Sequence, residues 1–265
     1  MSDPNLRAPI VLVHGILGFD EWELAGQDMV DYFRGVREFL SDAGYTVPQP
    51  PKLNTAGSVE ERANDLQEYL TTGALANEAV HLIAHSMGGL DARGMISRNN
   101  GGIAERIRTL TTIGTPHRGT PVADAGTTDF QLLLDALVAV HVDVKGFSNL
   151  TTDWAETFNQ KNDDMHKVPC FSIAGEFQAK GWRFFPPRAS DLLKLSYDII
   201  WDHGGGANDG LVPVESAKYG TFLGTWPADH FRLINWATNI VTPIEELEDP
   251  TILNSYLELV QSLPE

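Results

Sequence analysis

The chain has 265 residues, of which 42% are hydrophobic, 21% charged and 9% aromatic. These proportions are typical of a globular protein with a substantial core, and the length suits a single α/β domain. The formal net charge of −17 argues against nucleic-acid binding, because phosphate recognition requires clustered Lys and Arg, and the same sign repels anionic membrane surfaces.

No secretory leader is recognised at the N-terminus, because residues 1–7 are polar and run directly into an apolar strand pattern. The longest apolar stretch, residues 132–144, is broken by Asp135, His141 and Asp143, so no segment is predicted to span a membrane. We therefore expect a soluble chain, cytoplasmic as written or secreted if a leader has been removed, and the compartment stays open.

Short apolar runs alternate with helical patterns along the chain, which is typical of a mostly parallel sheet covered by helices on both faces. The predicted strands are residues 9–13, 80–84, 109–113 and 170–174. The predicted helices run from about 27 to 43, from a capping box at Ser58 and Glu61, from 88 to 98, and from Asp249-Pro250 to about 262. The single cysteine, Cys170, lies in the last strand and is expected to be a core residue, with no disulfide.

Residues 119–167 depart from this alternation. They contain an amphipathic stretch, 130–140, between loop-like flanks. An insertion at this place, after a central strand, is predicted to form a lid or cap over an active-site mouth, and an ordinary packing helix is the alternative. We expect residues 1–265 to form one domain that contains this insertion.

A nucleophile elbow is indicated by Ala84-His85-Ser86-Met87-Gly88, which lies between a predicted strand and a predicted helix. In such an elbow a tight turn projects the serine above the sheet, and small residues on either side are needed because the backbone segments approach closely. Ala84 stands where a glycine is more usual. The strand-turn-helix context makes Ser86 the candidate nucleophile.

An oxyanion hole needs two preorganised amide donors near this serine. Met87, directly after the nucleophile, is the first candidate. Ile16 is the second, because His14-Gly15 after the first strand lets the chain turn back toward Ser86. His14 is expected to organise this loop. A dinucleotide-binding interpretation of residues 15–18 is weak, because a third spaced glycine and an acidic ribose partner are missing.

The acid and the base of such a site follow the serine in the order Asp or Glu, then His. Asp209 lies in a turn that precedes a strand-like run, and His230 lies 21 residues later in a loop. We assign Asp209 as the orienting acid and His230 as the general base. The pair Asp202 and His203 is a rival.

Asp229 is a weaker alternative acid, because it adjoins His230 and cannot easily point at the same ring. His81 and His85 are expected to make structural hydrogen bonds. No convincing metal-ligand spacing is found, so no metal site is predicted.

The chain resembles the bacterial true lipases, in the wide sense that spans the Pseudomonas–Burkholderia and Bacillus groups. The matching segments are 9–15 (PIVLVHG), 84–90 (AHSMGGL), 113–119 (IGTPHRG), 148–152 (SNLTT) and 208–212 (NDGLV). The resemblance implies an α/β-hydrolase core and hydrolysis of triacylglycerols or other carboxylic esters. It also implies Ser86, Asp209 and His230 as the triad, with Ile16 and Met87 as oxyanion donors.

One departure from that family concerns its structural calcium. The larger lipases hold the ion with two aspartates, one upstream of the acid and one two residues after the catalytic His. Asp191 matches the first position, but the second is Arg232, a cation where an oxygen ligand is required. We therefore expect no calcium, and we hypothesise that Arg232 pairs with Asp191 in its place. The family's usual disulfide is also absent.

The predicted reaction is a two-step ester hydrolysis that requires no cofactor. Acyl lipids are the expected substrates, which leaves a lipid–water interface open as the place of action, and a triacylglycerol lipase is the favoured interpretation. An esterase, polyesterase or acyltransferase acting on short-chain or soluble acyl substrates is the alternative. A non-catalytic binding module of the same fold is a further alternative, which the presence of all three triad residue types disfavours.

Overall fold

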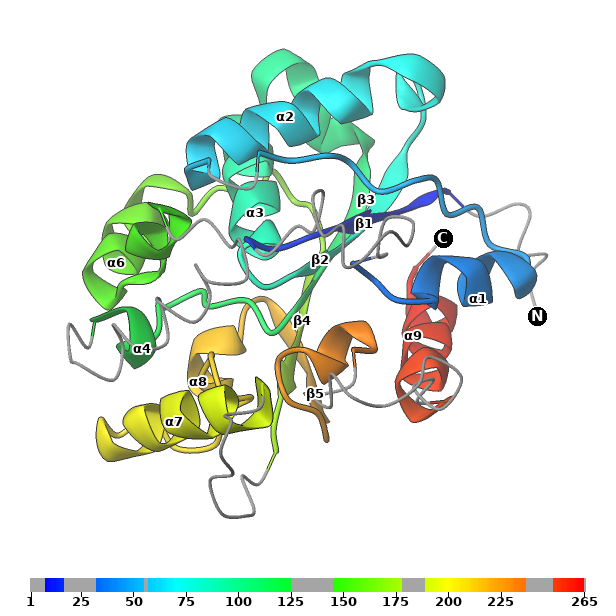
Figure 1. Ribbon diagram of the computed structural model, residues 1–265. Coiled ribbons are helices and arrows are strands. Elements are labelled where there is room, and N and C mark those ends of the chain that lie inside the picture. The colour runs from blue at the N-terminus through cyan, green and yellow to red at the C-terminus, as the bar shows by residue number, and fades with distance from the viewer. Residues whose placement is uncertain are drawn as a thin grey trace, which may run out of the picture.

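A central parallel sheet organises the molecule (Figure 1). The computed structural model describes residues 8–16, 32–54, 57–124, 145–177, 189–236 and 250–264. In this part of the chain the sheet has five strands, ordered β1-β2-β3-β4-β5 and parallel throughout. The strands are β1 (Ile10–Val13), β2 (Val80–His85), β3 (Ile107–Ile113), β4 (Cys170–Gly175) and β5 (Thr221–Trp226). The predicted α/β-hydrolase fold is confirmed.

Helices cover both faces of the sheet, and the alternation of side chains along β1 shows how. Ile10 and Leu12 pack into the core beneath α1 (Val36–Asp42) and α9 (Pro250–Ser262). Val11 and Val13 point to the opposite face, into the core beneath α2 (Val59–Thr71) and α3 (Gly88–Arg98). Figure 1 shows these two helix pairs on opposite sides of the strands. Continuous apolar strands are required here because both faces are buried.

A third group of helical segments belongs to neither of these two pairs. It consists of α4 (Pro121–Asp124), α6 (Thr152–Lys161), α7 (Ala189–Asp202) and α8 (Val214–Ala217), with the 3₁₀ turn Lys145–Leu150. The other 3₁₀ turns, Gly73–Leu75, Asn100–Arg106 and Arg232–Ile234, contact α2, α3 and α9 respectively. A separate apolar cluster joins Ile16 and Met87 to Val122, Leu150 and Phe158 from α4, the 3₁₀ turn and α6. The two predicted oxyanion residues therefore anchor this part of the fold.

The four predicted strands are confirmed, each to within two residues. Two differences concern the end of the sheet. The strand-like run after Asp209 is not a strand: an antiparallel bridge between Asn208 and Pro213 closes the turn, and α8 begins at once. The fifth strand, β5, was not predicted, because exposed and half-buried residues alternate along it and Gly224 interrupts its apolar pattern. Its signal in the sequence is correspondingly weak.

Among the helices, the Ser58–Glu61 capping box is present and opens α2, and the expected spans of α3 and α9 are confirmed. The helix predicted from about residue 27 begins only at Val36 within the described chain, because Gly35 before it has a positive φ of 67°. Residues 27–31 and Asp249 lie outside the described residues.

The amphipathic stretch 130–140 also lies outside the described residues, so the lid stays a prediction. Cys170 is half-buried rather than a full core residue, and burial raises the pKa of its thiol to about 11. No described helix combines the length and the apolar character needed to cross a bilayer.

Candidate active site

Ser86 occupies a sharp turn between β2 and α3. Its φ of 55° lies in the left-handed region, which non-glycine residues rarely adopt and which costs conformational energy. The Ser86 amide donates to the carbonyl of Ile113 on β3 at 3.0 Å, so the neighbouring strand holds the turn in place. The side chain is buried, at 6% relative exposure. The predicted elbow geometry is therefore present.

The elbow and the loop after β1 lie so close together that glycine is required at the contact. A β-carbon at Gly88 would lie 2.6 Å from the carbonyl oxygen of His14 and 2.7 Å from that of Val13. A β-carbon at Gly15 would lie 2.8 Å from the β-carbon of Ser86. Both distances are shorter than van der Waals contact, so neither position accommodates a larger residue without movement.

Asp209, His230 and Ser86 form one hydrogen-bonded chain. The Nε2 atom of His230 lies 3.0 Å from Ser86 Oγ, and Nδ1 lies 2.8 Å from Asp209 Oδ2. All three side chains are buried. This arrangement orients the imidazole so that its bare nitrogen can take the hydroxyl proton of the serine.

The local backbone holds the acid and the base in this position. Asp209 lies in the turn between α7 and α8, and its Oδ1 accepts the amides of Leu211 at 3.0 Å and Val212 at 2.7 Å. His230 lies in the loop after β5, and its own amide donates to the Asp209 carbonyl at 2.8 Å. The two residues are therefore linked through both backbone and side chain.

Two of the rivals, Asp229 and His203, have other partners, and Asp202 is exposed. The Asp229 carboxylate accepts the amides of Phe231 and Arg232, each at 3.0 Å, and thereby closes its own turn. Burial raises the pKa of Asp229 to about 6. The ring of His203 lies 2.8 Å from the carbonyl of Ile199 at the end of α7. The structure thus brings His230 and Asp209 to the serine and leaves these rivals in local contacts.

Ile16 lies in the loop after β1 and Met87 directly follows Ser86, and both are buried in the same apolar cluster. Among the described residues, no acceptor receives the backbone N–H of either one. The Gly15 amide, by contrast, is already engaged, since it donates to the hydroxyl of Tyr32 at 3.0 Å. The amides of Ile16 and Met87 are therefore without an acceptor within the described ranges, and their role as oxyanion donors stays a prediction.

His14 organises the loop that carries Ile16. Its Nδ1 lies 2.8 Å from the Gly15 carbonyl, and its Nε2 accepts the Leu53 amide at 3.2 Å. Burial lowers the pKa of His14 to about 3, and the charge of Arg62 acts in the same direction. The ring is therefore neutral and serves as donor and acceptor at once, as expected for an organiser.

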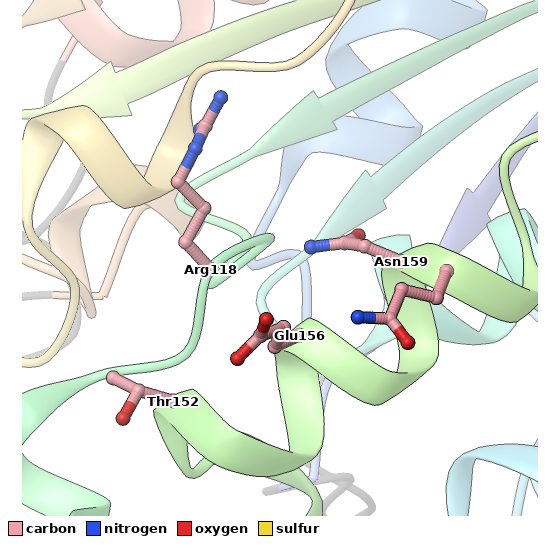
Figure 2. A pocket seen from close by; sticks show the side chains of 5 residues that line it. Arg118, Thr152, Glu156 and Asn159 are labelled. Atoms are coloured by element: carbon pink, nitrogen blue, oxygen red, sulfur yellow. The ribbon is translucent and has the colours of Figure 1, made fainter.

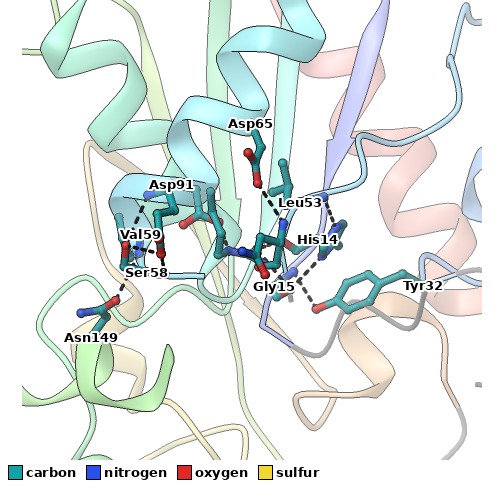
Figure 3. A network of polar contacts seen from close by, with 12 residues as sticks. His14, Gly15, Tyr32, Leu53, Ser58, Val59, Asp65, Asp91 and Asn149 are labelled. Atoms are coloured by element: carbon teal, nitrogen blue, oxygen red, sulfur yellow. Dashed lines mark hydrogen bonds and ion pairs between the residues drawn. The ribbon is translucent and has the colours of Figure 1, made fainter. Parts of the chain in front are cut away.

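A buried ion pair holds the same loop from the other side (Figure 3). The guanidinium of Arg62 donates to the carbonyls of His14 at 2.8 Å and Gly15 at 3.2 Å, and to Asp91 at 2.8 Å. Both charged side chains are fully buried. Burial raises the pKa of Asp91 to about 7, against the opposing effect of Arg62.

Sequence reasoning missed Arg62, Asp91 and Tyr32. A signal existed for Arg62, since it precedes Leu66 and Leu70 by four and eight residues and so shares their buried helix face. A charged residue in an apolar stripe indicates a buried partner, but the sequence does not say which one.

His81 and His85 make the structural hydrogen bonds that were expected of them, to Thr109 and Tyr32 respectively. The side chain of Asp191 lies outside the described residues, so its pairing with Arg232 stays a hypothesis. Within the described ranges, no group of three or more His, Cys, Asp or Glu side chains is placed to hold a metal ion.

A separate hollow of about 500 Å³ lies beside α6 (Figure 2). It is lined by Arg118, Thr152, Glu156, Asn159 and Gln160. The Arg118 guanidinium already donates to the carbonyls of Glu215 and Lys218, and none of the triad or oxyanion candidates lines this hollow. It is therefore distinct from the candidate active site.

Comparisons with known proteins find similar sequences and a similar fold. Residues 55–180 match the family model of the PGAP1-like alpha/beta domain. The chain is 34% identical over 254 residues to Triacylglycerol lipase 2 of Saccharomyces cerevisiae, covering 88% of this chain and 73% of that protein. It is 30% identical over 261 residues to a triacylglycerol lipase of Vibrio cholerae, covering 86% and 78%. The crystal structure of Staphylococcus hyicus lipase superposes with a TM-score of 0.68 at 19% identity, covering 99% of this chain and 97% of that chain.

Proposed function

The chain belongs to the triacylglycerol lipases and is a carboxylic ester hydrolase, and from this premise we propose that it cleaves acyl lipids, triacylglycerols in particular, with Ser86, His230 and Asp209 as a catalytic triad. Within that family we place it with the bacterial true lipases, whose sequence segments it shares. The observation that carries the mechanism is the continuous hydrogen-bonded chain from Asp209 through His230 to Ser86.

In the first step Ser86 Oγ attacks the ester carbonyl carbon while its proton passes to Nε2 of His230. The resulting imidazolium is stabilised by Asp209, which stays ionised. The bond to the alcohol then breaks, and His230 returns the proton to the departing oxygen. Water repeats the sequence on the acyl-enzyme, and the products are a fatty acid and free Ser86.

The negative charge that develops on the carbonyl oxygen requires donors that are already in place. We propose the amides of Ile16 and Met87, which have no other acceptor among the described residues. One such donor contributes roughly 3 to 4 kcal/mol to the transition state. No metal ion or organic cofactor enters this scheme.

Residues 119–167 are proposed to form the lid or cap. Support comes from the described part that follows the amphipathic stretch. A β-carbon at Gly146 would lie 2.4 Å from Ile16 Cδ1 and 3.4 Å from Met87 Sδ, so the chain passes directly against both oxyanion residues. Leu150 packs in the same apolar cluster. An insertion in this position controls access to the serine.

The test of the triad uses a fluorophosphonate probe and a chromogenic ester. Ser86→Ala is expected to abolish labelling and to lower ester hydrolysis by about 10⁶-fold. The matched control is Ser262→Ala, which removes a hydroxyl that donates within α9 and is expected to label fully. Retained labelling in Ser86→Ala would show that another residue is the nucleophile. An unlabelled wild-type protein would favour a non-catalytic binding module.

The substrate class is tested separately, by comparing matched esters of short and long acyl chains below and above their solubility limits. A lipase is expected to prefer long chains presented as an emulsion. A preference for short, dissolved esters or for acyl transfer to an alcohol would instead assign an esterase or acyltransferase, and would leave the triad unaffected.

A further inference from the structure

The hydroxyl of Tyr32 lies between two parts of the site that are distant in sequence. It accepts the Gly15 amide at 3.0 Å and lies 2.8 Å from Nδ1 of His85. Gly15 directly precedes the oxyanion residue Ile16, and His85 directly precedes Ser86. One phenol oxygen therefore contacts the residue before each of two groups that we propose to act on the substrate (Figure 3 shows its contact with Gly15).

His85 extends this link toward the base. Its ring is 1% exposed and packs against the ring of His230, with centroids 4.6 Å apart. Burial, and next the neighbouring His230, hold the pKa of His85 well below its ordinary value. A neutral imidazole carries a proton on one ring nitrogen only, and a hydroxyl 2.8 Å from Nδ1 can pair with that nitrogen in either tautomer and so orient the ring.

Tyr32 is itself held firmly enough to serve as a support. It is 8% exposed, and its backbone carbonyl accepts the indole N–H of Trp236 at 2.8 Å. Its ring contacts those of His14 and Phe33, at centroid distances of 5.5 Å and 5.1 Å. A β-carbon at Gly15 would lie 2.8 Å from the Tyr32 hydroxyl, so the loop is packed directly on that oxygen.

We propose that Tyr32 is a positioning residue, whose hydroxyl sets the loop that carries the Ile16 donor and fixes the His85 ring on which the His230 ring packs. This inference rests on the proposed function. The hydroxyl accepts the Gly15 amide and either donates to Nδ1 of His85 or accepts from it, according to the tautomer of the ring, whereas phenylalanine can do neither. Without the hydroxyl the Gly15 amide is left buried without a hydrogen-bond acceptor. Because such a donor is energetically costly, the loop is expected to move.

The test compares an ordinary ester with the thionoester of the same acid and alcohol. Sulfur in place of the carbonyl oxygen weakens hydrogen bonds from the oxyanion donors, so the oxo-to-thiono ratio of kcat/KM reports how well those donors are placed. Tyr32→Phe is expected to lower kcat for the oxoester by about 10-fold or more, with KM nearly unchanged, and to lower the oxo-to-thiono ratio several-fold.

Tyr256→Phe is the matched control. Its fully buried hydroxyl donates to the Leu233 carbonyl at 2.9 Å, so its removal also deletes one buried hydrogen bond. It is expected to lower the melting temperature by a similar amount and to leave the oxo-to-thiono ratio at the wild-type value. A structural role alone would move the melting temperature in both variants and the ratio in neither.

The outcomes separate the two proposals. If Tyr32→Phe is folded, labels on Ser86 and keeps the wild-type ratio, the positioning role is overturned while the triad stands. If wild type fails to label on Ser86, the proposed function fails first. Should Tyr32→Phe not fold, His85→Leu keeps the hydroxyl but removes its second partner; a smaller fall in the ratio supports the role, and an unchanged ratio refutes it.

Discussion

The two halves of the proposed active site are supported in different ways. In the acid–base half, Asp209 and His230 hold each other through side chain and backbone, and the turn that carries Asp209 supplies the remaining hydrogen bonds. In the oxyanion half, the loop at His14 and Gly15 is held by side chains from distant elements, chiefly Tyr32 and Arg62.

This difference predicts how substitutions in each half affect activity. The acid–base half depends mainly on its own few residues, with the packing of the His230 ring against His85 as its contact with the other half. The oxyanion half depends on several side chains from distant elements, chiefly Tyr32 and Arg62. Each of them fixes the position of the loop amide only in part. We therefore expect large, all-or-none losses in the first half and graded losses in the second.

The largest effect is expected in the acid–base half. Asp209→Asn keeps the shape of the turn but replaces a carboxylate oxygen facing Nδ1 by an amide, so the ring loses its orientation and its ionic partner. We expect kcat to fall by about 10⁴-fold, by analogy with other serine triads. Steady-state kinetics on a soluble ester measures it.

Asp229→Asn is the matched control for that variant. It changes the neighbouring buried carboxylate, which caps its own turn, and is expected to cost far less activity. Equal losses of kcat in Asp209→Asn and Asp229→Asn would not identify Asp209 as the acid. They would also contradict the view that this half depends mainly on its own residues.

An intermediate effect is expected in the oxyanion half. In Arg62→Lys the ammonium can still pair with Asp91. It cannot at the same time donate to the two loop carbonyls, as the planar guanidinium does. The loop should loosen and kcat should fall by about 10- to 100-fold, less than the loss of a whole oxyanion donor. KM is expected to change little, and single-turnover acylation rates would localise the loss to the first chemical step.

The comparison for this variant is Arg98→Lys on the adjacent helix, where the guanidinium donates to a carbonyl of its own helix at Gly94. No loss of kcat is expected there. A folded Arg62→Lys enzyme with wild-type kcat would mean that the loop does not need its outside support.

The smallest effect concerns pH and stability. Because the folded-state pKa of His14 is about 3 and the ordinary value is 6.5, only the unfolded chain takes up this proton below pH 6.5. The contribution of His14 to stability is therefore complete above pH 6.5 and is lost as pH falls toward 3. In His14→Gln the slope of unfolding free energy against pH, between 6 and 5, should be shallower by about 1.4 kcal/mol per pH unit.

Urea unfolding at several pH values measures that slope. His117→Gln provides a second neutral, buried histidine outside both halves, whose pKa burial also holds well below its ordinary value. It should reduce the slope similarly but leave kcat unchanged, whereas His14→Gln should lower both. Identical slopes in wild type and His14→Gln would show that His14 does not carry this pH dependence.

Much of the acid–base half could be predicted from the sequence. Ser86 is marked by a short motif between a strand and a helix, and the order of residue types then limits the choice of acid and base. The turn at Asp209 was predicted and is present, closed by a bridge from Asn208 to Pro213, but a short helix follows it where a strand-like run was expected. Local sequence does not separate these outcomes for so short an apolar run.

The sequence by itself determined the parallel sheet, most of its strands, and the residues whose neighbours form a recognisable motif, because period and turn chemistry act over a few residues. Only the tertiary structure decided which side chains support the oxyanion loop. Tyr32 is 17 residues from Gly15, and Arg62 is 48 residues from His14 and 29 from Asp91. Contacts of that kind depend on how the sheet and helices bring distant segments together, and no local pattern encodes them.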